Sequence, residues 1–255
     1  MKCPDILLFA LLLIGPVSSQ AAVTVSGDVQ SPGDVVIKPG AHLMDVISAT
    51  QPNAESYWLG AVWLHRPLED QQIRLKAAVL FDLKLLQQVA LLDGRETRAA
   101  LGARLHEQVE QLPVTGRQFA VLDPIALETG FALNARLDDG DRLIYPPRPS
   151  TVEVWGAVAQ PCRMPYTAGQ QARVYAQHCT ILSDAERDYL WLIQPDGQVR
   201  RIGVAAWNLE EGFTPAPGSR ILVPIKSDDL ETPTPELNQQ LAEFLATQLP
   251  DEVAP

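Results

Sequence analysis

One sequence pattern occurs twice in this chain, in the same phase, and it constrains the fold more than any other feature. The pattern is Val-x-Val-x-Gly-x-Val-x-x-Pro, and its first copy runs from Val23 to Pro32 and leads to Gly40. The second copy runs from Val152 to Pro161 and leads to Gly169, so every matched position is displaced by the same number of residues. A repeat in register indicates that the fold is built from one structural unit used twice.

The repeated unit also predicts its own local structure. Alternating valines are typical of a strand with one buried face. The glycine and the proline mark a bulge and a turn, after which a second short strand and a helix are expected. A β-hairpin followed by a helix and further strands is the order in which a β-grasp module begins. We therefore expect an α+β fold with two β-grasp domains.

The first module is interrupted by a stretch with helical periodicity. Apolar residues recur at helical spacing from Ile73 to Val89 and again from Leu101 to Val109, and Gly94 lies between the two runs. The pattern predicts a helical hairpin at about residues 66–112, inserted into the first domain. Prolines 146, 147 and 149 then mark a domain boundary. The expected parts of the chain are a signal peptide at 1–21, a first domain at 22–147, a second domain at 148–228, and a spacer with a terminal helix at 229–255.

The last part of the chain predicts an amphipathic helix. Thr234 suits the N-cap position and Pro235 the first helical position. One stripe of the helix carries apolar side chains: Leu237, Leu241, Phe244, Leu245 and Leu249. Two interpretations are open: the stripe packs on the chain's own body, or it packs on a partner. We take the helix as the candidate site of contact with a partner protein. Membrane contact is not expected, because the polar face has no Lys or Arg.

The N-terminus has the features of a secretion signal. Lys2 is followed by the apolar run Ile6–Ile14, which Gly15 interrupts, and small residues follow at the expected cleavage site. The run is too short to cross about 30 Å of hydrocarbon. The mature chain keeps two cysteines, Cys162 and Cys179, and in an oxidising compartment such a pair is expected to form a disulfide. The bond would join the second hairpin to the helix that follows it.

Charge and motifs exclude several classes of function. The formal net charge of −11 argues against nucleic acid, which requires a basic face, and against anionic lipid. The four histidines are scattered, and the sequence has no H-x-x-x-H, G-x-S-x-G, P-loop or dinucleotide motif. We therefore expect no metal, no cofactor and no catalytic residue. A pair of carboxylates of the glycosidase type stays open, because such a pair is recognised by its separation in space.

The chain resembles the GfcC-type capsule biosynthesis proteins, whose domains are of the soluble ligand-binding β-grasp type. The residues that carry the likeness, in order, are Gly60–Trp63, Thr115–Arg117, Leu122–Pro124, Arg148–Pro149, Val152–Val158, Ala168–Gly169, Trp207–Asn208, Pro217–Ser219 and Leu237–Asn238. The resemblance implies two β-grasp domains, an inserted helical hairpin, a terminal amphipathic helix and a place in the periplasm. It implies no known catalytic activity, and as partners it implies a polysaccharide, an outer-membrane polysaccharide exporter, or both.

Arg117 is the first candidate for ligand binding, because the resemblance suggests an arginine that lines a cleft here. A guanidinium offers five donors in a fixed fork that suits carboxylates and sugar hydroxyls. The alternative is a salt bridge or a cap on the end of the preceding helix. On the ligand-binding interpretation, Arg117→Ala lowers polysaccharide export and barely changes stability. Trp58 and Trp63 are further candidates that could stack on sugars, as are Trp155 and Trp207, although such aromatics more often belong to the core.

The sequence thus predicts a non-enzymatic periplasmic accessory protein in export or assembly of a capsule or exopolysaccharide. It would bind the glycan or the export machinery. One alternative is an enzyme that modifies the polysaccharide with a carboxylate pair. Another is a purely structural adaptor without a glycan site.

Overall fold

The computed structural model describes residues 20–227 and 234–250. The expected signal peptide, except for its last two residues, lies outside the described residues. The same is true of most of the expected spacer before the terminal helix.

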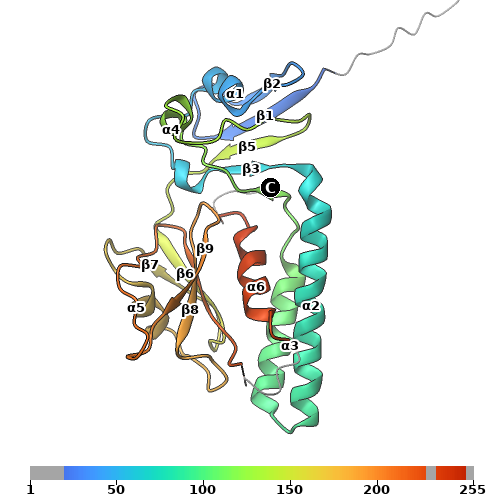
Figure 1. Ribbon diagram of the computed structural model, residues 1–255, viewed down its shortest axis with the longest axis vertical. Helices are drawn as coiled ribbons and strands as arrows, with labels where there is room; N and C mark the ends of the chain where they lie inside the picture. Colours follow the sequence, from blue (N-terminus) through green and yellow to red (C-terminus); the bar gives the residue numbers. More distant parts are fainter. Residues whose placement is uncertain (1–19, 228–233, 251–255) are drawn as a thin grey trace, which may run out of the picture.

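Two five-stranded sheets with the same strand order form the body of the protein (Figure 1). The first sheet has the order β2-β1-β5-β3-β4, with strands β1 (Ala22–Gly27), β2 (Gly33–Val36), β3 (Val62–Leu64), β4 (Arg117–Gln118) and β5 (Arg142–Tyr145). The second has the order β7-β6-β10-β8-β9, with strands β6 (Thr151–Gly156), β7 (Cys162–Pro165), β8 (Tyr189–Ile193), β9 (Val199–Gly203) and β10 (Arg220–Val223). In each sheet one central pair is parallel, β1 with β5 and β6 with β10, and the other pairs are antiparallel. The expected α+β class with two domains is confirmed.

The glycines of the repeat have the same role in both sheets. Gly27 and Gly156 end their strands with a positive φ, at 89° and 95°. A Cβ atom at Gly27 would overlap the carbonyl oxygen of Tyr145, and one at Gly156 would overlap that of Val223. Each glycine therefore allows the hairpin to turn tightly against the last residue of the parallel neighbour strand. This close approach is the physical reason that the pattern is kept in both copies.

The first sheet is covered by α1 (Leu43–Thr50) and α4 (Pro124–Glu128). Side chains from both helices and from the sheet form one core, which includes Val23, Leu43 and Leu143. Short 3₁₀ turns, Trp58–Gly60 and Arg66–Leu68, flank β3.

The helical hairpin lies between β3 and β4 in the chain. It consists of α2 (Glu69–Leu92) and α3 (Glu96–Gln111), within the range expected from the sequence. Its buried side chains, among them Leu83 and Leu105, belong to the core of the second sheet and not to that of the first. The hairpin is thus part of the first domain in sequence and of the second in packing.

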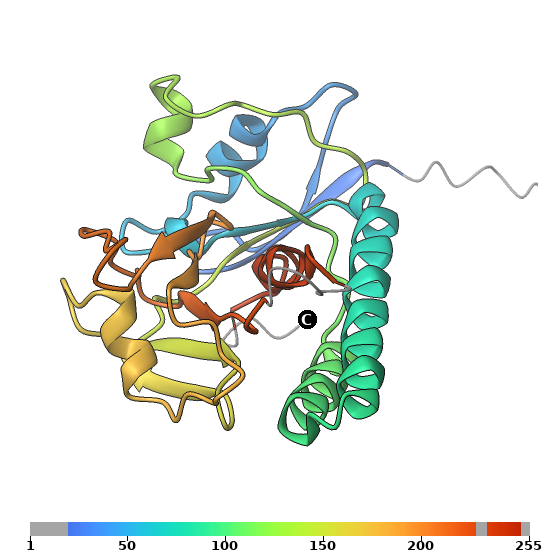
Figure 2. The same cartoon turned by 60° about the horizontal axis from the view of Figure 1, so that its bottom comes forward.

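The second sheet is covered by a helix on each face (Figure 1). One is α5 (Ala172–Gln177), and the other is α6 (Leu237–Ala246), which lies between the sheet and α2 (Figure 2). Four residues of the apolar stripe of α6 are almost completely buried in this core: Leu237, Leu241, Phe244 and Leu245. The fifth, Leu249, packs beneath the first sheet. The stripe expected to contact a partner is instead covered by the chain's own body.

Cys162 of β7 and Cys179, two residues after α5, form a disulfide with their Cα atoms 6.3 Å apart. The bond joins the second hairpin to its helix. Across the described residues, no helix is both long enough and apolar enough to cross a membrane.

Candidate functional site

Arg117 is buried at the junction of three parts of the chain, with only 4% of its surface exposed. Its Nη1 donates to the carbonyl oxygens of Ala246 (3.0 Å) and Gln248 (3.3 Å) at the end of α6. Its Nη2 donates to the carbonyl oxygen of Pro195 in the β8–β9 turn. Burial, and then the positive charge of Arg220, lower the pKa of the Arg117 guanidinium to about 10. All these acceptors are backbone groups, so we assign Arg117 a structural role in place of the ligand-binding role predicted from the sequence.

Arg220 of β10 binds the same helix end. Its Nη1 donates to the carbonyl oxygens of Leu245 (3.4 Å) and Gln248 (3.3 Å), and its Nη2 to that of Leu249 (2.8 Å). The last carbonyls of a helix have no partner within the helix and carry the negative end of its dipole. Two guanidinium groups therefore stabilise the C-terminal end of α6, and one of them comes from the first domain.

Trp58 and Trp63, two of the four candidate tryptophans, lie in different environments. Trp63 is 5% exposed and belongs to the core of the first sheet, so it is not available to a sugar. Trp58 is 43% exposed and borders a hollow of about 490 Å³, with Tyr57, Arg148 and Tyr166. The Arg148 guanidinium lies 5.4 Å from the centre of the Tyr57 ring. The Tyr57 hydroxyl donates to the carbonyl oxygen of Pro217 across the two domains, and burial raises the pKa of Tyr57 to about 12.

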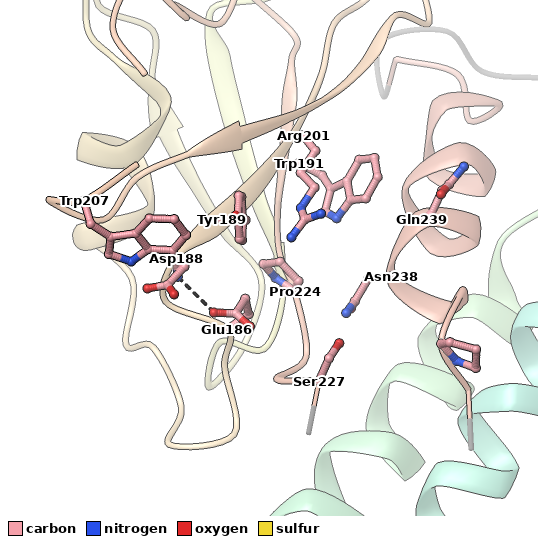
Figure 3. A pocket seen from close by; sticks show the side chains of 11 residues that line it. Glu186, Asp188, Tyr189, Trp191, Arg201, Trp207, Pro224, Ser227, Asn238 and Gln239 are labelled. Atoms are coloured by element: carbon pink, nitrogen blue, oxygen red, sulfur yellow. Dashed lines mark hydrogen bonds between the residues drawn. The ribbon is translucent and has the colours of Figure 1, made fainter. Parts of the chain in front are cut away.

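A second hollow, of about 480 Å³, lies between the second sheet and the first turn of α6 (Figure 3). We call it the aromatic cleft and define it by six residues: Glu186, Asp188, Tyr189, Trp191, Arg201 and Trp207. Asn238 and Gln239 of α6 form the opposite wall. The sequence analysis had singled out only Trp207 among these residues.

The strand geometry explains why the aromatic side chains of the cleft lie together. Tyr189 and Trp191 are two residues apart on β8 and therefore point to the same face. Arg201 of β9 is the register partner of Trp191. Trp207 follows β9 and is 70% exposed. Its ring meets that of Tyr189 edge to face, with the ring centres 6.2 Å apart and an angle of 88°.

The polar groups of the cleft are held in different ways. The Glu186 carboxylate accepts from the backbone amides of Arg187 (2.8 Å) and Asp188 (3.0 Å), which fixes it to its own turn. The backbone carbonyl of Asp188 accepts from the amide of Val204 (2.9 Å) and from Nδ2 of Asn208 (3.0 Å), which anchors the segment that carries Trp207. The two carboxylates of the cleft thus come from one segment, and they do not face each other across it.

Arg201 lies flat on an aromatic ring, with its guanidinium carbon 3.6 Å from the centre of the Tyr189 ring. Within the described part of the chain, this guanidinium makes no hydrogen bond or ion pair. The same described residues contain no group of three or more His, Cys, Asp or Glu that could hold a metal ion. The described residues of the cleft therefore offer aromatic faces, the Arg201 cation and carboxylate oxygens.

Comparison with known protein families identifies the chain. Residues 19–146 match the family described as Capsule biosynthesis GfcC, N-terminal, and residues 160–250 match Capsule biosynthesis GfcC C-terminal. The chain belongs to the GfcC family. One relative of this GfcC protein is "Uncharacterized protein YjbG" of Escherichia coli (strain K12), with 33% identity over 243 residues. The alignment covers 94% of this chain and 96% of that protein. Membership of the GfcC family places the chain in capsule biosynthesis.

A second relative of this GfcC protein is larger. "Polysialic acid transport protein KpsD" of Escherichia coli is 25% identical over 203 residues. The alignment covers 79% of this chain but only 35% of KpsD.

Proposed function

We propose that this GfcC-family protein is a non-enzymatic periplasmic accessory of capsule or exopolysaccharide export, and that it binds the glycan in the aromatic cleft. The observation that carries the proposal is Trp207, whose indole is mostly exposed and is held edge to face on Tyr189. A sugar ring has an apolar face of C–H groups that an exposed indole can cover. Trp191 and Asp188 offer further contacts in the same cleft.

The hollow at Trp58 supports a second contact with the same glycan. Like the aromatic cleft, it combines an exposed tryptophan with a tyrosine ring beneath an arginine. We therefore keep Trp58 as a proposed ligand residue and drop Trp63, which belongs to the core.

The positions of the carboxylates favour binding over hydrolysis. Catalytic carboxylates of glycosidases flank the bond that they cleave, on opposite sides and about 5–9.5 Å apart. Glu186 and Asp188 are two residues apart on one segment, and Glu186 accepts from backbone amides. We therefore propose that the cleft holds the glycan without cleaving it.

Similarity to KpsD, a protein named for polysialic acid transport, supports a place beside the export machinery. Because the stripe of α6 is buried, a contact with an exporter would use another surface.

The proposal is tested with the mature protein and oligosaccharides prepared from the capsule or exopolysaccharide of the producing cells. Trp207→Ala should weaken binding at least tenfold, about 1.4 kcal/mol, because the stacking face is lost. The melting temperature should stay close to that of the wild type, because Trp207 is exposed. Titration calorimetry and thermal unfolding measure the two quantities.

Phe131→Ala is the matched control. Phe131 is 91% exposed, lies in the first domain and borders neither hollow, so its loss should leave binding unchanged. Equal affinity of the wild type and Trp207→Ala would overturn the role of the cleft. Loss of export in cells without any glycan binding would favour a structural adaptor. The appearance of new reducing ends with time would favour an enzyme.

A further inference from the structure

The charged groups of the aromatic cleft are separated along it. Figure 3 shows Asp188 on the Trp207 side of Tyr189 and Glu186 below Tyr189, whereas Arg201 lies beside Trp191 on the side that faces α6. The cleft therefore has an acidic end and a basic end, with Tyr189 between them.

Arg201 is held in place by its neighbours in the second sheet. Its stacking on Tyr189 and its place in the β8–β9 ladder fix the guanidinium above the floor of the cleft. The planar fork of a guanidinium matches a carboxylate with two parallel hydrogen bonds.

The polar groups around Arg201 are engaged elsewhere. The Glu186 carboxylate accepts from two backbone amides. On α6, Gln239 donates to Glu243, and Asn238 exchanges hydrogen bonds with the backbone of Ile225. Asp188 lies at the other end of the cleft. Among the described residues, the cation thus faces the hollow without an anionic partner, and the positive end of the α6 dipole lies on the same side.

We propose that the aromatic cleft recognises a sugar that carries a carboxylate, of the uronic acid type, and this inference rests on the proposed glycan-binding function. The carboxylate pairs with Arg201 in the bidentate geometry. The neighbouring sugar covers Trp207, and its hydroxyls donate to Asp188. The two ends of the cleft therefore fix the direction in which the chain lies.

The net charge of the protein limits this recognition to one position. A formal charge of −11 repels a polyanion at long range, so a carboxylate is accepted only where a local cation offsets that repulsion. The cleft thus favours glycans in which acidic and neutral sugars alternate over chains in which every sugar is charged.

The test compares probes that differ only in the carboxylate. The probes are hexasaccharides of hyaluronan and of the producing cells' own acidic polysaccharide, each with a counterpart whose carboxyl groups have been reduced to alcohols. For at least one pair, wild-type protein should bind the acidic form at least tenfold more tightly than the reduced form. The Arg201→Gln variant should bind that acidic form with only the affinity that the wild type has for the reduced form.

Arg200→Gln is the matched control. Arg200 is the neighbour of Arg201 on β9, is also exposed and stacks on Phe213 at 4.3 Å, but it points to the other face of the sheet. The substitution changes the net charge equally and should leave both affinities unchanged. Thermal unfolding of both variants shows whether they are folded.

The outcomes separate this inference from the function on which it rests. If acidic and reduced forms bind equally and Trp207→Ala weakens both, the cleft binds glycans but the carboxylate inference is wrong. Equal losses in Arg200→Gln and Arg201→Gln would also overturn it, because the effect would be one of net charge. If no probe of either form binds, the proposed function fails and the inference fails with it.

Discussion

At the scale of single residues, Arg117 shows how a buried charge can be accommodated by backbone carbonyl groups. Its donors bind the backbone carbonyls of Ala246, Gln248 and Pro195, and buried carbonyl groups require such partners. The cost of removing the charge from water is visible in its lowered pKa. The carbonyl oxygens therefore stabilise the buried guanidinium, and the guanidinium in turn supplies these oxygens with hydrogen-bond donors.

Arg117→Ala should lower the free energy of unfolding by about 3 kcal/mol, because the buried carbonyls lose their donors. Arg117→Lys should recover only part of the lost free energy of unfolding, because an ammonium group cannot reproduce the forked donor geometry of a guanidinium. The exposed Arg187→Ala is the control and should change stability by less than about 0.5 kcal/mol. Denaturant unfolding measures all three. An Arg117→Ala protein as stable as the wild type would contradict the structural role.

From the sequence, Arg117 could bind a ligand, form a salt bridge or cap the preceding helix, but the contact with the end of α6 could not be predicted. The carbonyls that it binds on α6 lie 129 and 131 residues further along the chain. The aromatic cleft was hidden for a related reason. The run from Tyr189 to Ile193 has no polar residue, so it looks like a fully buried strand. Only the sheet shows that its aromatic side chains face a hollow and its leucines the core.

At the scale of elements, α6 shows which features of a helix the spacing of its apolar residues can predict and which it cannot. The spacing from Leu237 to Leu249 correctly indicated an apolar stripe, because helical geometry alone places these side chains together. It could not indicate what covers the stripe, because that surface is assembled from α2 and the second sheet. The helix ends at Ala246, and the two arginines bind the carbonyl oxygens of its last two residues.

Phe244 is fully buried at the centre of this packing. Phe244→Ala should lower the free energy of unfolding by about 3–5 kcal/mol, because a large cavity is left in the core that α6 shares with α2 and the second sheet. Glu243→Ala, on the neighbouring position, should cost less than about 0.5 kcal/mol. Denaturant unfolding checks both variants. If Phe244→Ala were as stable as Glu243→Ala, the helix would not be part of the core.

At the scale of the whole molecule, sequence order and packing divide the chain differently. The repeat and the matching strand orders define two units. The helical hairpin interrupts the first unit, yet its apolar side chains complete the core of the second. Arg104 of α3 also donates to the carbonyl oxygens of Gly156 and Val158, within the second copy of the repeat. Together with Arg117, these contacts tie the two units into one.

The second unit should therefore not fold without the hairpin. A fragment of residues 148–250 would leave the apolar faces of α6 and of the second sheet uncovered where α2 and α3 pack in the whole protein. We expect it to bind a dye specific for exposed apolar surface and to melt without a sharp transition. Co-expression with residues 66–112 supplies the missing face and should restore a cooperative transition. A fragment of residues 22–65 is the control, because it carries none of that surface and should not rescue folding. A cooperative melt of residues 148–250 alone would show instead that the second unit is complete without the hairpin.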